Sequence, residues 1–278
     1  MFMPLTFLAI GAGANRGRPS ARSGSDHVRS IVMCSSLLST KGHIMRLVSS
    51  SAIAVALAMF IPPVIGAQGQ ETARTVAGGG ISLPGWTGKI DANEEKQGQV
   101  LNNAKLAGDA KTMSVTTGPA VAYWNPANKA TGNYTVKATF HEAKYMNLND
   151  HPHPYGIFIA GNDMGTADQS YLYCAAYGNG NFIVRGFGPA AFQMNGRRGE
   201  ASPAVNKAAG KDQPVTQEIA LSVKGDRVEC SINGTVVAGY NKADLVAAGK
   251  LKSTDGIYGI RFAHNTEATV SGFSLTKN

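Results

Sequence analysis

Residues 155–187 constrain the fold of this chain more than any other stretch. They contain three short runs rich in β-branched and aromatic residues, separated by residues 161–165 and by the Gly-Asn-Gly-Asn sequence at 178–181. Gly and Asn accept the positive φ angles that tight hairpin turns require. The stretch therefore predicts a meander of three antiparallel strands at the centre of an all-β domain.

The sequence on either side of this stretch also shows the patterns of short strands and tight turns. Residues 132–141 alternate apolar and polar side chains, which is the pattern of a half-buried strand. Asn233-Gly234 is a second strong hairpin signal, and residues 81–278 contain no convincing long amphipathic helix. About ten to twelve short strands with regularly spaced turns predict a jelly-roll β-sandwich of two antiparallel sheets.

The first 80 residues are expected to lie outside this sandwich. Residues 45–67 have a basic start, a short apolar core and small residues before Gln68, which indicates a secretory signal peptide cleaved near Ala67. Serines and prolines interrupt the apolar core, so a stable membrane anchor is not expected. Residues 68–80 are polar and end in glycines, as a linker does. We expect a secreted or periplasmic protein.

Residues 1–44 are rich in Arg and Ser, and Asp26 is their only acidic residue. Two interpretations fit this composition. The start codon is assigned too early and Met45 is the true start, or the segment is an organelle transit peptide, which shares this composition. We favour the first, because a transit peptide followed directly by a secretory signal would be unusual.

The basic charge of the chain lies mainly in these upstream segments. The whole chain has a formal net charge of +8, but residues 1–67 hold six Lys/Arg and one acid. The remaining 20 Lys/Arg and 17 Asp/Glu leave a net charge of +3. Nucleic-acid binding is therefore not expected.

Two cysteines remain after the predicted signal peptide, Cys174 and Cys230. Each alternates with apolar residues in a strand-like run, so both are expected to face the core. Disulfides persist in exported proteins, so a bridge between them is possible. Two buried thiols remain the alternative, because cysteine also packs as a small apolar residue and the sequence does not give the Cα separation.

Several short motifs carry a family resemblance over most of residues 81–278. Their order resembles the concanavalin-like lectin and glucanase sandwiches and, more narrowly, the bacterial exported domains of the 3-keto-disaccharide hydrolase family. This resemblance implies a β-sandwich that binds or hydrolyses carbohydrate. The motifs lie at residues 85–88 (Gly-Trp-Thr-Gly), 132–136 (Gly-Asn-Tyr-Thr-Val), 155–158 (Tyr-Gly-Ile-Phe), 228–235 (Val-Glu-Cys-Ser-Ile-Asn-Gly-Thr) and 256–262 (Gly-Ile-Tyr-Gly-Ile-Arg-Phe).

The sequence departs from the catalytic pattern of these families. Laminarinase-like members carry a Glu-x-Asp-x-x-Glu strand, because glycoside hydrolysis uses two carboxyl groups at a fixed separation. Glu94-Glu95 and Glu229 have no matching partners here. The acidic strand of many keto-disaccharide hydrolases is replaced by the Tyr-Leu-Tyr-Cys sequence at 171–174. Whether the protein is an enzyme therefore stays open.

Alternation also predicts a set of residues on the outer side of one sheet. If Leu172 and Cys174 face the core, three tyrosines of the same run face outward. Aromatic rings stack on sugar rings, while Arg and His donate hydrogen bonds to hydroxyl groups. The alternative is that tyrosine simply suits exposed strand positions. The candidate ligand-binding residues are Tyr171, Tyr173, Tyr177, Arg185, Arg261 and His141.

The Asp-His-Pro-His-Pro sequence at 150–154 contains the candidate metal ligands. His151 and His153, with Asp150, Asp163 or His141, offer the imidazole and carboxylate groups that zinc prefers. A calcium site of loop carbonyls with Asp150 or Asp163 is a further alternative. We favour a solvated loop without a metal or other cofactor, because each histidine precedes a proline that favours extended backbone. His264 is given no role.

These observations are compatible with three functions. The leading hypothesis is an exported module that binds carbohydrate or glycoconjugate on one face of the sandwich. The second is a glycoside hydrolase that acts on keto-disaccharides, with acid and base groups among His141, His153, Asp150 and Asp163. The third is a structural or adhesion module that uses a long loop at 188–213 as a flat contact surface.

Overall fold

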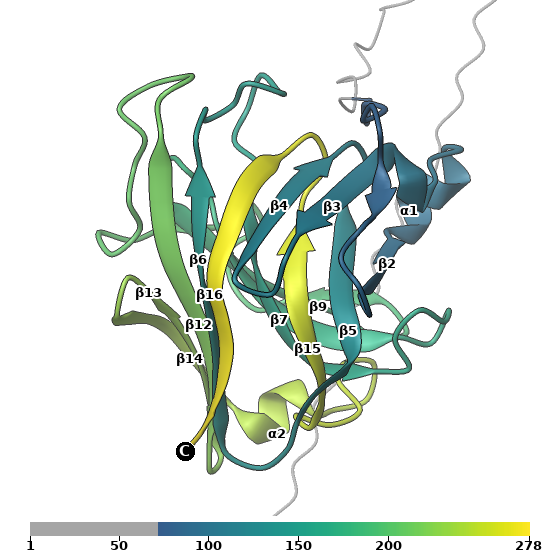
Figure 1. Ribbon diagram of the computed structural model, residues 1–278. Coiled ribbons are helices and arrows are strands. Elements are labelled where there is room, and N and C mark those ends of the chain that lie inside the picture. Colours follow the sequence, from purple (N-terminus) through teal and green to yellow (C-terminus); the bar gives the residue numbers. More distant parts are fainter. Residues whose placement is uncertain (1–71) are drawn as a thin grey trace, which may run out of the picture. The chain divides into compact units, whose positions relative to one another are not determined.

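The computed structural model describes residues 72–278, in which two β-sheets pack face to face (Figure 1). The segments at 1–44 and 45–67 lie outside the described residues. Sheet A contains, in spatial order, β1 (Gly80–Ile81), β3 (Ala104–Gly108), β4 (Thr112–Thr117), β16 (Glu267–Lys277), β6 (Tyr134–Glu142), β12 (Val215–Lys224), β13 (Arg227–Ile232) and β14 (Thr235–Asn241). Its strand pairs are antiparallel except for β1 with β3.

Sheet B faces sheet A across the core. It contains, in spatial order, β10 (Ala191–Gln193), β9 (Asn181–Phe187), β8 (Ser170–Ala176), β7 (Tyr155–Asn162), β15 (Gly256–Phe262), β5 (Val121–Ala130) and β2 (Thr87–Ile90), and β11 (Glu200–Ala201) also pairs with β9. The predicted meander is β7, β8 and β9, which are antiparallel neighbours. The predicted all-β jelly-roll sandwich of two sheets is confirmed.

Helical structure is sparse in the described part of the chain. It consists of α1 (Ala92–Lys96), the 3₁₀ turn η1 (Leu101–Asn103) and α2 (Lys242–Leu245). Within residues 72–278, no helix has both the length and the apolar character that a membrane crossing requires.

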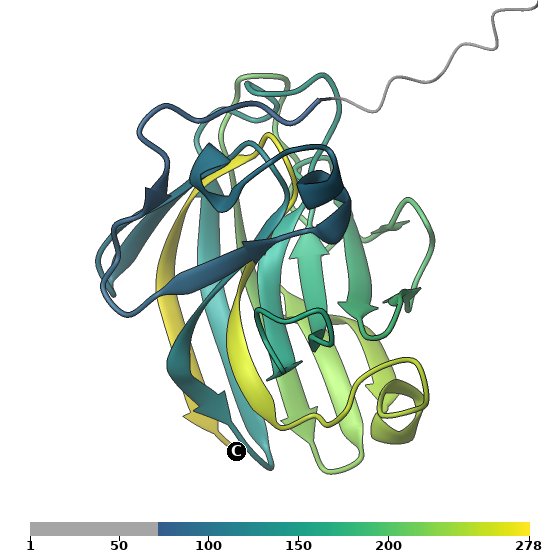
Figure 2. The same ribbon diagram turned by 90° about the vertical axis from the view of Figure 1, so that its right-hand side faces the viewer.

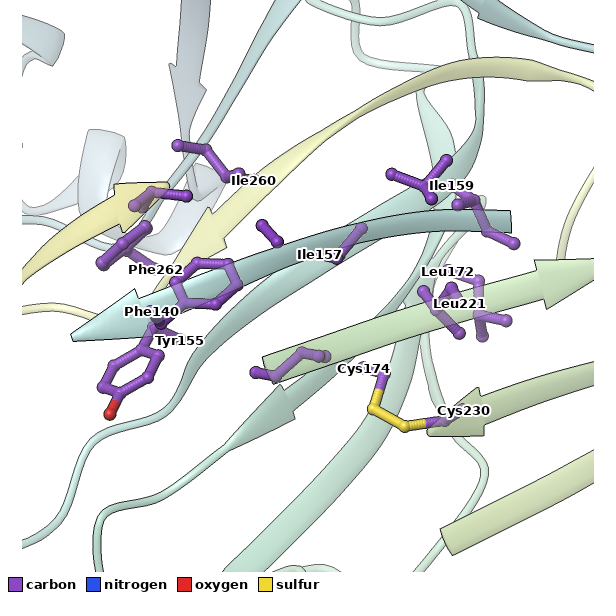
Figure 3. Packing of buried hydrophobic residues seen from close by; sticks show 14 of the residues in the cluster. Phe140, Tyr155, Ile157, Ile159, Leu172, Cys174, Leu221, Cys230, Ile260 and Phe262 are labelled. Atoms are coloured by element: carbon purple, nitrogen blue, oxygen red, sulfur yellow. A yellow bond between two sulfur atoms is a disulfide. The ribbon is translucent and has the colours of Figure 1, made fainter. Parts of the chain in front are cut away.

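The main core lies between the two sheets and follows from the alternation of each strand. Phe140 of β6 stacks on Tyr155 of β7, with ring centroids 5.5 Å apart, and lies 5.9 Å from the ring of Phe262 of β15 (Figure 3). These three rings are fully buried. Large aromatic side chains bury the most apolar surface per residue, so this group anchors one end of the core.

A disulfide joins the two sheets. Cys174 of β8 in sheet B is bonded to Cys230 of β13 in sheet A, with their Cα atoms 6.1 Å apart (Figure 3). The two residues are 56 positions apart in the sequence. Closing a loop of this length in the unfolded chain stabilises the folded state by about 4 kcal/mol in the chain-entropy treatment.

The segment expected to be a linker packs on the sandwich from Thr72 onward. Ala73 is buried, and its carbonyl accepts a hydrogen bond from Nε2 of Gln99 at 3.2 Å. The backbone N–H of Arg74 donates to Oδ1 of Asn265 at 2.9 Å. These two residues, upstream of the expected domain start at residue 81, are thus held by hydrogen bonds to the sandwich.

The segment at 188–213 was expected to form an extended loop over one end of the sheet. Instead it adds the short strands β10 and β11 to the free edge of β9 (Figure 2). Phe192 of β10 packs over Gly186 of β9, where a Cβ atom would lie 2.1 Å from the ring. The segment thereby builds a wall beside the outer face of sheet B.

A second apolar cluster lies on that outer face, separate from the main core. Its members are buried although they point away from sheet A. They are Ala122, Trp124, Phe158, Tyr171, Tyr173, Ala175 and Ile183, with Met164, Tyr177, Phe187 and Ile257 partly buried against them. This outer cluster forms the floor of the candidate site.

Candidate functional site

A cleft of about 800 Å³ opens over the outer cluster. Its lining comes from β8, β9 and β15, from the 188–213 segment, and from the loops that hold His151, His153 and His264. This volume lies within the range of small-molecule and oligosaccharide pockets. The cleft contains aromatic, cationic and imidazole groups in three adjoining zones.

The aromatic zone lies on β8 and β9. Tyr173 pairs directly opposite Arg185, and its ring is stacked at 24° against Phe187 with centroids 6.3 Å apart. Tyr173 is 7% exposed, and burial raises the pKa of its hydroxyl. Tyr177, just beyond β8, is partly exposed and also lines the cleft. Their rings offer an apolar surface at the bottom of the cleft.

Tyr171 points outward as predicted from alternation, but it does not line the cleft. It is 1% exposed, because its ring lies 5.0 Å from Phe158 and 5.0 Å from Phe187. Burial raises the pKa of its hydroxyl. The expected exposed position of Tyr171 is corrected: neighbouring aromatic rings cover it, and its part in the site is to support them.

Arg261 of β15 is the most constrained charge in the cleft. Its guanidinium carbon lies 5.7 Å from the ring centroid of Tyr173 and 5.6 Å from that of Phe187, a cation–π arrangement. Its Nη2 donates to Oδ2 of Asp91, just before α1, at 2.5 Å. Burial acts to lower the pKa of Arg261, but Asp91 opposes this and the net shift is upward, so the group stays charged.

Nη1 of Arg261 has no hydrogen-bond partner in the described part of the chain. The residue is 6% exposed, and within residues 72–278 no hydrogen-bond acceptor reaches its Nη1. Leaving a buried charged donor unsatisfied is costly, so such donors normally have a partner. Arg261 also lines the cleft.

Three further arginines give the cleft its charge. Nη2 of Arg185 donates to the backbone carbonyl of Arg197, which ties the 188–213 segment to β9. This contact positions the exposed side chains of Arg197 and Arg198 on the cleft wall. Among the described residues that line the cleft, Asp91 is the only carboxylate. The lining is therefore cationic and favours an anionic ligand.

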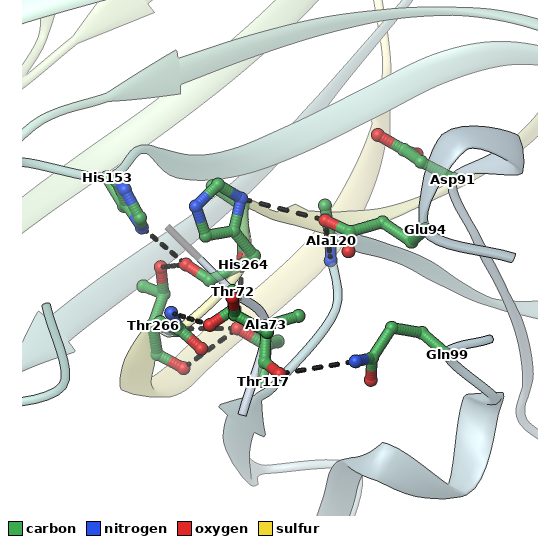
Figure 4. Close-up of polar contacts among 12 residues, drawn as sticks. Thr72, Ala73, Asp91, Glu94, Gln99, Thr117, Ala120, His153, His264 and Thr266 are labelled. Atoms are coloured by element: carbon green, nitrogen blue, oxygen red, sulfur yellow. Dashed lines mark hydrogen bonds and ion pairs between the residues drawn. The ribbon is translucent and has the colours of Figure 1, made fainter. Parts of the chain in front are cut away.

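The imidazole zone arises from strand pairing. Tyr155 at the start of β7 pairs with Phe262 at the end of β15. This pairing continues as Ala263 donates its N–H to the carbonyl of Pro154 at 3.0 Å. His153 and His264 are therefore brought together from positions 111 residues apart, with ring centroids 4.2 Å apart (Figure 4).

Hydrogen bonds orient the rings of His151 and His153, and a carboxylate lies near the ring of His264. Nδ1 of His153 lies 2.5 Å from the carbonyl oxygen of His264, and Nδ1 of His151 lies 2.7 Å from Oδ1 of Asp150. Oε1 of Glu94 is 3.6 Å from Nδ1 of His264 (Figure 4). Burial, and then the neighbouring His264, lower the pKa of His153 to about 4, so this ring is neutral at physiological pH.

Two of the predicted site residues lie elsewhere. His141 is on β6 of sheet A, where its Nδ1 lies 2.8 Å from Oγ1 of Thr216. Its expected place beside the tyrosines is wrong, because β6 pairs with β12 and β16 and not with any strand of sheet B. Asp163 lies beyond β7 and forms an ion pair with Lys252, so it does not join His151 and His153.

No role is predicted for His264 from the sequence, although the structure places it with His151 and His153. The available signal was its position: His264 lies two residues after β15, and His153 lies two residues before β7. That symmetry becomes informative only once β7 and β15 are known to pair. Phe187, Arg197 and Arg198 were also missed, because only the folded 188–213 segment encloses the cleft.

The lining does not supply the carboxyl pair of a typical glycosidase. That chemistry uses two carboxyl groups about 5 to 9.5 Å apart, one as acid and one as base or nucleophile. Asp91 is committed to Arg261, and no second carboxylate lines the cleft in the described part of the chain. The lining instead offers aromatic surface and guanidinium donors.

No protein-family model and no curated protein sequence matches this chain. Among solved structures, it is similar to carbohydrate-binding module CBM66 from Bacillus subtilis, with 8% identity, 72% of this chain and 99% of that chain covered, and a TM-score of 0.46. It is also similar to an endo-β-1,3-glucanase from Pyrococcus furiosus, with 12% identity, coverage of 69% and 89%, and a TM-score of 0.42. Sheep galectin-11 is similar as well, with 10% identity, 61% of this chain and 99% of that chain covered, and a TM-score of 0.35.

Proposed function

We propose that this protein binds carbohydrate in the cleft over sheet B, and that the preferred sugars carry an acidic group such as a carboxylate or sulfate. The unpartnered Nη1 of the buried Arg261 is the observation that carries the proposal. A guanidinium presents its donors in a fixed planar fork that matches a carboxylate or sulfate. A neutral sugar hydroxyl would satisfy one donor, whereas an acidic group would also be attracted by the other arginines of the lining, Arg185, Arg197 and Arg198.

The aromatic zone supports the same function. Tyr173, Tyr177 and Phe187 offer ring faces beside Arg185 and Arg261, so one ligand can contact apolar and cationic groups together. The faces of pyranose rings are apolar and stack on aromatic side chains, while their rims carry hydroxyl and acidic groups. An inorganic anion would contact the arginines but would leave the aromatic ring faces without a partner.

A binding screen on acidic and neutral oligosaccharides tests this proposal. We expect binding to uronate-containing or sulfated glycans, weaker binding to their neutral counterparts, and at least about a tenfold loss of affinity in Tyr177→Ala. Tyr240→Ala is the matched control, because Tyr240 is also partly exposed but lies on β14 of sheet A. Absence of glycan binding, or equal losses in both variants, contradicts the proposal.

Hydrolysis of keto-disaccharides is the second candidate, and the histidine group beside the cleft is the observation that favours it. Imidazoles can act as general acids or bases when a substrate lies within hydrogen-bond reach. Incubating the same oligosaccharides and their 3-keto forms with the protein distinguishes the two functions: binding without new reducing ends supports the module, and turnover supports the enzyme. The concave cleft differs from the flat face that the adhesion hypothesis predicts.

We also propose that the protein is exported. The disulfide between Cys174 and Cys230 supports this location, because such bonds persist in oxidising compartments. Fractionation of the producing cells, with detection of the oxidised protein outside the cytoplasm, tests it. A reduced protein confined to the cytoplasm contradicts it.

A further inference from the structure

The orientation of His151 and His153 is fixed by acceptors that cannot donate. Asp150 offers carboxylate oxygen to Nδ1 of His151, and His264 offers backbone carbonyl oxygen to Nδ1 of His153. Each Nδ1 must therefore carry the proton. In a neutral imidazole with Nδ1 protonated, Nε2 carries a lone pair, so both Nε2 atoms are electron-pair donors.

These two Nε2 atoms face each other at 2.7 Å. Two lone pairs at this separation repel, so this point must hold either a proton shared between the rings or a metal ion that both rings ligate. The third histidine adds to the same point, because one ring nitrogen from each of His151, His153 and His264 lies within 4.8 Å of the other two. Three nitrogen donors converge on one small volume at the side of the cleft.

We propose that His151, His153 and His264 form a binding site for a zinc-type divalent transition metal ion. Neutral imidazole nitrogen suits zinc and its neighbours in the first transition row, whereas calcium and magnesium take oxygen ligands. Three protein ligands leave the fourth tetrahedral position open, as in metal sites that bind water or a substrate. This inference stands on the histidines alone and does not depend on the carbohydrate proposal.

The surroundings match the outer sphere of a histidine metal site. Metal-bound histidines usually donate their other N–H to a carboxylate or a backbone carbonyl, which fixes the ring. Asp150 does this for His151, the carbonyl of His264 does it for His153, and Glu94 lies 3.6 Å from Nδ1 of His264. Each ring thus has an oxygen group behind it that directs Nε2 forward.

Metal entry requires a small widening of the group. Nitrogen ligands at 2.0–2.1 Å from a tetrahedral zinc ion stand roughly 3.3 Å apart, compared with the 2.7 Å between the two Nε2 atoms. His151 lies on an exposed loop with 55% of its side chain exposed, so this ring can move outward. His153 is buried and supplies the fixed ligand. All three histidines line the cleft, so an ion bound by them would lie at its side.

Zinc binding to the purified protein, freed of metal by a chelator, tests the site. Calorimetric titration with Zn²⁺ should give one ion per chain, and elemental analysis after dialysis should give the same number. Co²⁺, which prefers similar ligands, should add a visible absorption band of tetrahedral type. His151→Ala should weaken Zn²⁺ binding by more than about tenfold, and Asp150→Asn, which removes a carboxylate behind one ligand, by about tenfold.

His141→Ala is the matched control, since His141 is an exposed histidine on sheet A. It should bind Zn²⁺ as the unaltered protein does. Asp150 is 87% exposed at its side chain, so Asp150→Asn leaves the packing intact and separates loss of metal from loss of fold. Failure of the unaltered protein to bind one Zn²⁺, or equal weakening by His141→Ala and His151→Ala, overturns the inference.

Discussion

The outer faces of the two sheets are built on different principles. On sheet A, Lys137 and Glu218 are exposed and form an ion pair at 3.5 Å, and His141 is exposed beside Thr216. On sheet B, the corresponding outward positions hold aromatic residues that are buried outside the main core. A sandwich needs only one core to fold. The second apolar cluster, under a cationic cleft, therefore distinguishes the outer face of sheet B as the candidate functional face.

The difference has an energetic side. The outward side chains of sheet A stay solvated and form surface ion pairs, which contribute little to stability. Outward residues of sheet B bury aromatic area, which contributes much more per residue. The cleft is therefore supported by a rigid floor, and substitutions on the two faces should have unequal effects.

The largest contrast is expected between Phe158→Ala and Thr139→Ala. Phe158 is fully buried in the outer cluster of sheet B, and its removal should cost about 4 kcal/mol of unfolding free energy. Thr139 points outward from β6 on sheet A, where the change should stay within about 0.5 kcal/mol. Denaturant unfolding measures both. Similar losses for the two variants would remove the distinction between the faces.

The two sides of β6 provide a second contrast. Glu142 faces inward, and burial raises its pKa from 4.5 to about 7. A carboxyl with a raised folded-state pKa contributes most stability below its unfolded pKa, and that contribution is lost as pH rises. We therefore expect unfolding free energy to fall by about 3 kcal/mol between pH 4.5 and 7.

The substitution Glu142→Gln should remove this pH dependence, because the amide does not titrate. Glu218→Gln serves as its control, since Glu218 points outward from the neighbouring strand β12 and its side chain is exposed. Unfolding curves across this pH range give the comparison. If the slope persists in Glu142→Gln, another group is responsible for it.

The substitution Arg261→Lys compares the two sheets by their effect on ligand affinity. Lysine keeps the positive charge near Asp91 but loses the planar fork and the stacking on Tyr173 and Phe187. We expect affinity for acidic glycans to fall about tenfold, which corresponds to about 1.4 kcal/mol. Arg227→Lys on β13 of sheet A should leave affinity unchanged. An undiminished affinity in Arg261→Lys would exclude a bidentate role for its guanidinium.

The smallest effect is expected at the surface ion pair of sheet A. Lys137→Ala should change the unfolding free energy by less than about 1 kcal/mol, because both side chains of the pair are about half exposed. It should also leave glycan binding unchanged. A marked loss of binding in Lys137→Ala would show that sheet A contributes to recognition.

Features that depend on contacts between residues close in the sequence could be predicted, whereas features that depend on contacts between distant segments could not. Alternation within single strands and the turn at 178–181 placed Tyr173 and Arg185 on one outward face, because they belong to one local hairpin. Tyr171 obeyed the same alternation, but its burial depends on Phe158 and Phe187 from neighbouring strands. Solvent exposure of an outward residue is set by what packs over it, which alternation does not report.

The errors concern pairings between distant segments. His141 was assigned to the wrong face because the sequence does not say which sheet a strand joins. His264 was given no role because its neighbours, His151 and His153, lie more than 100 positions away and meet it only through the pairing of β7 with β15. Contacts of this kind carry no local periodicity, so a single sequence cannot supply them.

Footprinting of the protein with a bound acidic oligosaccharide tests the central claim most directly. Hydroxyl radicals label exposed side chains, and a ligand in the cleft should protect Tyr177 and Phe187 while leaving Tyr240 of sheet A labelled as before. Protection of Tyr177 and Phe187 alone would establish the outer face of sheet B as the binding face. Protection confined to sheet A, with Tyr177 unchanged by the ligand, would contradict it.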